Sequence, residues 1–384
     1  MKQVGKRFSA WMLAAALAVS APGPALYAAG AEGAPAAAGE AVVGEEPVSE
    51  GESDPHAVRV AKSNAEARNG SPIDMQYDGF VFANGTSIVI KEVEGVTGIY
   101  DTDGNLLSEG VDVSECAIYG GWYDGDNTHT GNTSIVMESG TINCIFGGSF
   151  SGTLNGDTCV TLNGGTVGWV YGGGNQSNVT GTAQVTVNKG AEIWGPKLSD
   201  GEAEDKGTVF GGGYMGSVES TEVVINGGDA GWVYGGGEKD TVNSTHVSLL
   251  EMTDDFTNVY GGGNEGTVQK AVLKLCAEPS GWCYGGGYNG SVGEAEIIIS
   301  GSWERSGGTS IYGGGAGESG SVGSAVFRVS LTQSVQGGSV KVLPGLGDGL
   351  KGAGVTGSVS ADFSGIGEIS YDYRAYVSDV DQVR

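Results

Sequence analysis

One short phrase, an aromatic residue followed by two or three glycines, returns eight times along this chain of 384 residues. Its intervals are 27, 25, 39, 24, 26, 24 and 28 residues. A repeat of this length indicates a solenoid, because one such coil cannot bury its apolar face without a neighbouring coil. The eight aromatic residues are Tyr119, Phe146, Tyr171, Phe210, Tyr234, Tyr260, Tyr284 and Tyr312.

Apolar residues recur at fixed distances from each aromatic residue. The residue before it is apolar in every repeat, and a later alternating pair, such as Val223/Ile225, is apolar too. Alternation with period 2 in short runs rich in β-branched residues indicates strands. A further apolar residue follows six of the rings eight positions later and Tyr312 ten positions later, after a two-residue insertion. These residues are Leu154, Val179, Val218, Val242, Val268, Val292 and Val322.

Three short strands and their turns account for one repeat. We therefore predict an all-β fold, a single-stranded parallel β-helix of about eight coils with 24–28 residues each. Right-handed winding is expected, since parallel crossovers have that hand. Helices are excluded in the repeats, which show no apolar period of 3.6 residues and contain glycine too often.

The long interval of 39 residues indicates one coil plus an inserted loop. We place this loop at residues 195–207, an acidic stretch that contains Pro196 and breaks the alternation. Glycine is abundant, with 73 of the 384 residues. We expect the glycines at sharp turns and where a neighbouring coil or ring packs close to the backbone.

The composition divides the chain into five segments. Basic residues followed by an apolar run and small residues are typical of a secretory signal peptide, so we expect a bacterial protein, secreted or at the cell surface, without a membrane span after cleavage. A low-complexity spacer, which we expect to be disordered, follows. The predicted segments are 1–28 (signal peptide), 29–70 (Ala/Gly/Pro/Glu spacer), 71–116 (N-terminal cap and first irregular coil), 117–355 (solenoid repeats) and 356–384 (C-terminal cap).

The net charge of −27 limits the partners of this protein. Without a basic patch the chain cannot hold a phosphate backbone, which argues against nucleic acid. Self-repulsion that keeps a secreted rod dispersed is one explanation of the charge. Binding of calcium or of a cationic surface is the alternative.

The five cysteines do not form the pattern of a disulfide framework. Cys283 occupies a position that is Val or Ile in other coils, so we expect a buried, small apolar residue. A bridge between Cys116 and Cys144, from neighbouring coils, is open but not expected.

No set of residues predicts catalysis or a cofactor. Sugar-cleaving enzymes need carboxylates that converge in one groove, whereas the acidic candidates here are scattered. Asp240 and Glu265 come nearest to each other in the repeat. No two of the three histidines have the spacing of metal ligands, and the Asp101–Asn105 segment is better explained as a hairpin turn than as a calcium site. The remaining acidic candidates are Asp254, Asp255 and Glu294.

The aromatic column is the candidate binding surface. If the preceding apolar residues point inward, strict alternation places the rings outward, on one face of the solenoid. Stacking of the rings on one another and on glycine backbone, without any ligand, is the alternative. The candidate ligand-binding residues are Tyr171, Tyr234, Tyr260, Tyr284 and Tyr312, with Trp169, Trp232 and Trp282 two positions before their tyrosines.

The signal peptide, the spacer and coils that read GWVYGGG, as in 231–242, resemble the Gly-rich adhesin-like β-solenoid proteins exported by Gram-positive gut bacteria. The resemblance covers residues 75–355, is one of repeat style, and transfers no catalytic or binding residue. It implies a non-enzymatic surface or secreted protein, adhesin-like or structural, in contact with glycans, a host or neighbouring cells. The alternative function is a polysaccharide lyase or glycoside hydrolase on the same fold.

Overall fold

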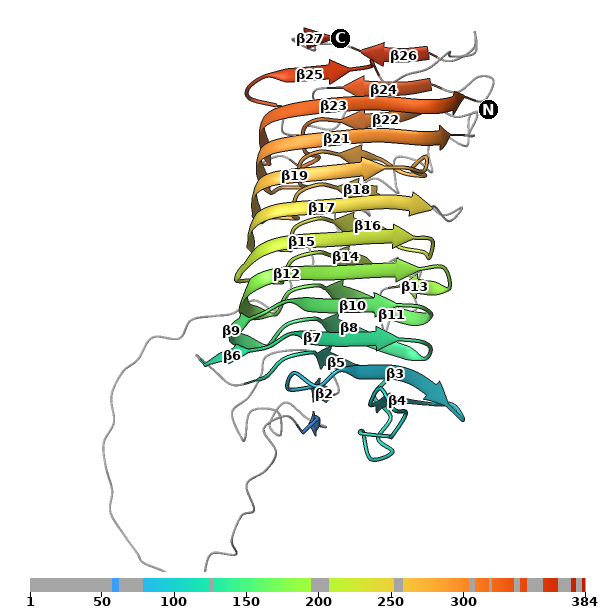
Figure 1. Cartoon of the computed structure of the whole chain (residues 1–384), viewed down its shortest axis with the longest axis vertical. Coiled ribbons are helices and arrows are strands. Elements are labelled where there is room, and N and C mark those ends of the chain that lie inside the picture. Colours follow the sequence, from blue (N-terminus) through green and yellow to red (C-terminus); the bar gives the residue numbers. More distant parts are fainter. Residues whose placement is uncertain are drawn as a thin grey trace, which may run out of the picture.

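The computed structural model shows an all-β protein in which two parallel sheets run along the long axis of the molecule (Figure 1). Within the part of the chain that the structure describes, there are strands and turns but no helix. The predicted signal peptide, most of the spacer and the inserted loop lie outside the described residues. These comprise 57–61, 79–123, 127–194, 207–251, 258–303, 308–317, 320–334, 339–343, 355–364, 374–377 and 382–383.

The first sheet contains the short strands that end on the repeated aromatic residues. Its neighbours pair in parallel, except that β1 is antiparallel to β2. In spatial order the strands are β1 (Arg59–Ala61), β2 (Gly79–Phe82), β5 (Cys116–Tyr119), β8 (Thr141–Phe146), β11 (Gly165–Tyr171), β14 (Thr208–Phe210), β16 (Trp232–Tyr234), β18 (Asn258–Tyr260), β20 (Cys283–Tyr284), β22 (Gly308–Tyr312), β24 (Ser339–Leu343) and β26 (Arg374–Val377), with β13 (Ala191–Ile193) beside β11.

The second sheet contains the longer strands that follow each glycine turn. It is parallel except for β4, which is antiparallel to β3. In spatial order the strands are β4 (Val96–Tyr100), β3 (Ile88–Val93), β7 (Thr133–Met137), β10 (Thr158–Leu162), β12 (Gln176–Asn188), β15 (Ser217–Asn226), β17 (Thr241–Glu251), β19 (Thr267–Leu275), β21 (Ser291–Trp303), β23 (Ser321–Ser334), β25 (Val359–Asp362) and β27 (Gln382–Val383), with β6 (Thr128–Thr130) and β9 (Ser151–Asn155) at the side.

The strand register confirms the predicted β-solenoid. Val218 pairs with Val242, Val242 with Val268, and Val268 with Val292. The column continues to Leu154 in one direction and Val322 in the other. The eight repeated aromatic residues end eight consecutive neighbours of the first sheet, from β5 to β22. Like side chains of successive coils therefore lie over one another.

The hydrophobic core fills the space between the two sheets. Val170, Val209 and Val233 from the first sheet form one buried cluster with Val223 and Val247 from the second. Complete burial of one such side chain stabilises the fold by roughly 1.5–3 kcal/mol. Cys283 belongs to the same cluster, between Val259 and Ile311, and so confirms the prediction of a small buried residue. All five cysteines are free thiols.

Threonines form a polar column inside this apolar core. Each hydroxyl donates a hydrogen bond of 2.6 Å to the carbonyl oxygen of the first glycine after the ring in the next coil. The bond satisfies a backbone acceptor at a turn where water has no access. The four pairs are Thr133–Gly147, Thr158–Gly172, Thr221–Gly235 and Thr245–Gly261.

The long interval between repeats is an insertion within one strand of the first sheet. Val167 of β11 pairs with Ile193, but Trp169 pairs with Thr208, so the chain leaves the sheet and returns beside the same strand. The Gly207 N–H closes this excursion on the Ile193 carbonyl oxygen at 2.9 Å. The excursion has the place predicted for the loop.

The parallel stack extends beyond the eight repeats at both ends. At the N-terminal end β2 and β3 already pair in parallel with the coil that follows, and the antiparallel strands β1 and β4 cover their outer edges. At the other end β24 to β27 continue the parallel pairing. The antiparallel strands at the N-terminal end interrupt the parallel pattern that another coil would need to continue the stack.

Replacing Thr245 with Val should lower the free energy of unfolding by about 1–3 kcal/mol, because the Gly261 carbonyl oxygen would lose its buried donor. Urea denaturation followed by circular dichroism measures this change. Thr245→Ser keeps the hydroxyl and should lose less. A Val variant as stable as the parent would show that the bond contributes nothing net.

Candidate functional site

The aromatic residues form one continuous stack of nearly parallel rings. From Phe82 to Tyr312 the centroids of neighbouring rings are 4.6–5.2 Å apart, and their planes differ by 2–21°. This distance equals the spacing of neighbouring strands, so the sheet itself sets the ring separation. We call this stack the ring ladder. It packs on the face of the first sheet that lies opposite the core, as alternation predicts.

The expectation that the ring ladder is an exposed surface is wrong. Tyr234 and Tyr260 are each 3% exposed, and Tyr284 is 1% exposed; Tyr171 and Tyr312 are also buried. The glycines after each ring turn the chain back, so that the residue four positions after the ring covers the ladder. Tyr214 meets Tyr171 edge-on with centroids 6.5 Å apart, and Tyr288 meets Tyr260 at 6.4 Å.

The three tryptophans flank the ladder and are half-buried. Trp169 pairs with Thr208, Thr208 with Trp232, and Trp232 with Asn258, so a tryptophan occupies every second coil. Asn258 accepts a hydrogen bond from the Trp282 N–H through its side-chain oxygen at 3.0 Å. Of the predicted site residues, these tryptophans keep the most contact with solvent.

Tyrosine hydroxyls of the ladder reach side chains two coils farther on. The Tyr171 hydroxyl donates to Glu238 Oε2 at 2.8 Å. Burial raises the pKa of Glu238, and the bond from Tyr171 opposes that rise. One coil later, Phe210 takes the place of Tyr171 and Asn264 takes the place of Glu238. Phe210 has no hydroxyl, and the buried Asn264 Oδ1 has no hydrogen-bond partner in the described part of the chain.

Asp240 stabilises the glycine turns of two neighbouring coils. Its carboxylate is buried and accepts the peptide N–H groups of Gly213 at 2.8 Å and Gly237 at 2.9 Å. Burial raises the pKa of Asp240 to about 7, although these two bonds act in the opposite direction. Glu265, the other carboxylate predicted near this edge, is exposed, and its peptide N–H bonds the Glu238 carbonyl oxygen at 2.7 Å.

The Asp101–Asn105 loop is a hairpin turn in the structure. Asp101 accepts hydrogen bonds from the N–H groups of Asp103 and Asn105, and Tyr100 bridges Leu106, which confirms the hairpin turn. Across the described ranges, no group of three His, Cys, Asp or Glu side chains is placed to bind an ion. The same ranges contain no helix with the length and apolarity that a membrane crossing needs. Asp254 and Asp255 lie outside them.

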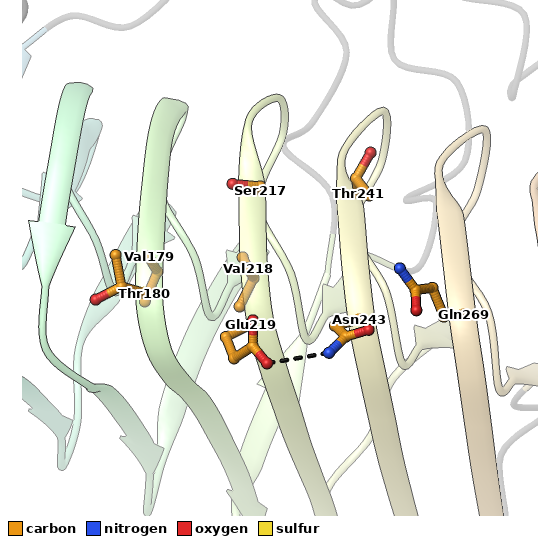
Figure 2. Close-up of a pocket in the computed structure, with 8 residues that line it drawn as sticks. All are labelled: Val179, Thr180, Ser217, Val218, Glu219, Thr241, Asn243 and Gln269. Carbon is orange, nitrogen blue, oxygen red and sulfur yellow. Dashed lines mark hydrogen bonds between the residues drawn. The ribbon is translucent and has the colours of Figure 1, made fainter.

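An open groove along the outer face of the second sheet is a further candidate contact site (Figure 2). In each of these strands two or three successive residues, such as Glu219 and Ser220, face outward between inward-facing residues such as Val218 and Thr221, which bends the strand. The groove continues into a second hollow that shares Asn243 and Gln269 with the first. It therefore crosses the strands from β12 to β23, parallel to the long axis.

Columns of hydroxyl and amide groups line this groove. Two rows of side chains cross the strands (Figure 2). We call the row of hydroxyl residues in direct register the hydroxyl wall, and the row two residues farther along the strands, which contains Glu219, Asn243 and Gln269, the amide floor. Asn243 Nδ2 donates to Glu219 Oε1 at 3.0 Å. The hydroxyl wall can be read from the sequence, because a Ser or Thr stands seven residues after the ring in four successive repeats and nine residues after Tyr312. These hydroxyl residues are Ser217, Thr241, Thr267, Ser291 and Ser321.

No family model, curated protein or solved structure matches this chain.

Phe210→Tyr should raise the free energy of unfolding by about 1 kcal/mol, because its hydroxyl would reach the unpaired Asn264 Oδ1. Urea denaturation measures the gain. An Asn264→Leu background provides the control, since the gain should vanish there. A gain that persists in that background would contradict the predicted bond.

The free energy of unfolding should fall as the pH rises from about 4 to about 7, because of the raised pKa of Asp240. Its pKa is higher in the folded than in the unfolded chain, so the stabilisation is complete below about pH 4 and is lost as the pH rises through about 7. Asp240→Asn should flatten the slope of unfolding free energy against pH by up to about 1.4 kcal/mol per unit. Glu265→Gln, at an exposed carboxylate, should keep the slope. Equal slopes for Asp240→Asn and the parent would refute this assignment.

Proposed function

We propose that this protein is an exported, non-enzymatic β-solenoid, adhesin-like or structural, that contacts glycans at the bacterial surface or in the medium. The observation that carries this proposal is the long groove on the second sheet, lined by hydroxyl and amide side chains. Hydroxyl and amide groups held on a rigid sheet suit a hydroxyl-rich partner, since both sides can donate and accept hydrogen bonds. The sequence of residues 1–28 supports export.

The hydrogen-bond partners of the carboxylates support a non-enzymatic role. The buried carboxylate of Asp240 accepts hydrogen bonds from two peptide N–H groups, and the half-buried carboxylate of Glu238 accepts one from the Tyr171 hydroxyl. In the groove, Glu219 is bonded to the amide of Asn243. These carboxylates act on the protein's own groups, whereas glycoside cleavage needs carboxylates directed at a substrate.

In this proposal the ring ladder stiffens the rod, and the contact surface is elsewhere. The buried tyrosines offer no face to a sugar. The half-buried Trp169, Trp232 and Trp282 provide a second, smaller contact surface beside the ladder.

A glycan array probed with the mature protein tests the proposal. We expect retention of polysaccharides that are recovered intact, with no shortened chains and no unsaturated ends. The same preparation, secreted from a Gram-positive host expressing the full chain, should begin near residue 29. Release of cleaved sugars would favour the lyase or hydrolase alternative, and failure of the folded protein to bind any glycan would exclude glycan contact.

A further inference from the structure

We propose that the groove on the second sheet binds one linear, uncharged polysaccharide chain that runs parallel to the solenoid axis. This inference rests on the proposed function, because it names the site and the class of glycan. It assigns the contact to the hydroxyl wall and the amide floor.

The groove is long and runs parallel to the solenoid axis. Its two hollows share Asn243 and Gln269, and their lining residues extend from Val179 on β12 to Gly323 on β23. Six neighbouring strands span about 24 Å at the usual strand spacing. A site this long and open at its sides fits an extended polymer better than a small molecule.

Several groups that line the groove are available to a ligand. The hydroxyls of Thr241 and Thr267 and the amide of Gln269 are exposed and make no side-chain hydrogen bond to the described residues. Each of these hydroxyls both donates and accepts, and the amide does the same through its two ends. Such groups match the hydroxyl and acetamido groups of sugars.

The strand pairing and the charge of the groove disfavour a peptide strand and a polyanion. A peptide that adds to a sheet needs unpaired backbone groups, but the strands beneath the groove are paired on both sides. A polyanion would meet Glu219 and Glu294, and Lys270 is the one basic residue among those that line the groove. The charge therefore favours an uncharged chain over nucleic acid or an acidic polysaccharide.

The groove presents the same hydroxyl position on each successive strand. The register places equivalent hydroxyls of Ser217, Thr241, Thr267 and Ser291 one strand apart, about 4.8 Å. One sugar unit of an extended pyranose chain advances by a similar length. Because neighbouring sugars of an extended β-1,4 chain are turned relative to each other, every second sugar can meet every second rung in the same way, and affinity should rise with chain length until the groove is full.

Calorimetric titration with linear β-1,4-linked oligomers of glucose, mannose, xylose and N-acetylglucosamine, from dimer to hexamer, tests this inference. For at least one series we expect affinity to rise by about tenfold or more from dimer to hexamer. Asn243→Ala with Gln269→Ala, and separately Ser244→Trp as a block of the groove, should each weaken hexamer binding about tenfold or more. Circular dichroism checks that each variant is folded.

Asn188→Ala with Asn226→Ala is the matched control. These asparagines form a hydrogen-bonded column on the same sheet with Asn163, away from the groove lining. The control should bind as the parent does. Glycan binding that survives both groove changes, affinity that does not depend on oligomer length, or preference for polygalacturonate would overturn the groove assignment and leave glycan contact standing. A folded parent that binds no glycan on the array would overturn the proposed function itself.

Discussion

The parallel hydrogen-bond ladder between successive coils is the interaction on which the rest of this structure depends. It keeps equivalent residues of neighbouring coils paired through the second sheet, apart from single shifts in three strand pairs, and so places side chains over their equivalents at about 4.8 Å. That distance brings valines into contact and lets aromatic rings stack face to face. The column, more than the single residue, is therefore the unit of packing in this protein.

The same spacing explains the glycines that follow each ring. A Cβ atom on Gly235 would lie 2.3 Å from the carbonyl oxygen of Gly261 in the next coil. No side chain fits there, so the turn stays tight and the following segment folds back over the ladder. The glycines thus decide both how closely the coils approach and what covers the rings.

Polar groups divide between the fold and the surface according to their place in the coil. Thr245, Asp240 and Glu238 face buried turns, where each meets a backbone or tyrosine partner. Outward groups at the bend of the long strands, such as Thr241 and Gln269, face solvent in the groove instead. A buried polar group must be paired, whereas an exposed one is available to a ligand, and this difference locates the proposed contact surface.

The amino-acid sequence by itself determined the solenoid, its columns, the inward Cys283 and the site of the insertion, because spacing and alternation are local properties that repeat in every coil. Only the tertiary structure decided which outward columns reach solvent. The rings of Tyr234 and Tyr260 face away from the core, as alternation requires, yet the segments after the glycine turns cover them. The groove likewise arises where Glu219 and Ser220 break the alternation and bend the strand. Burial depends on contacts between segments of different coils, and these contacts are absent from the spacing of any single repeat.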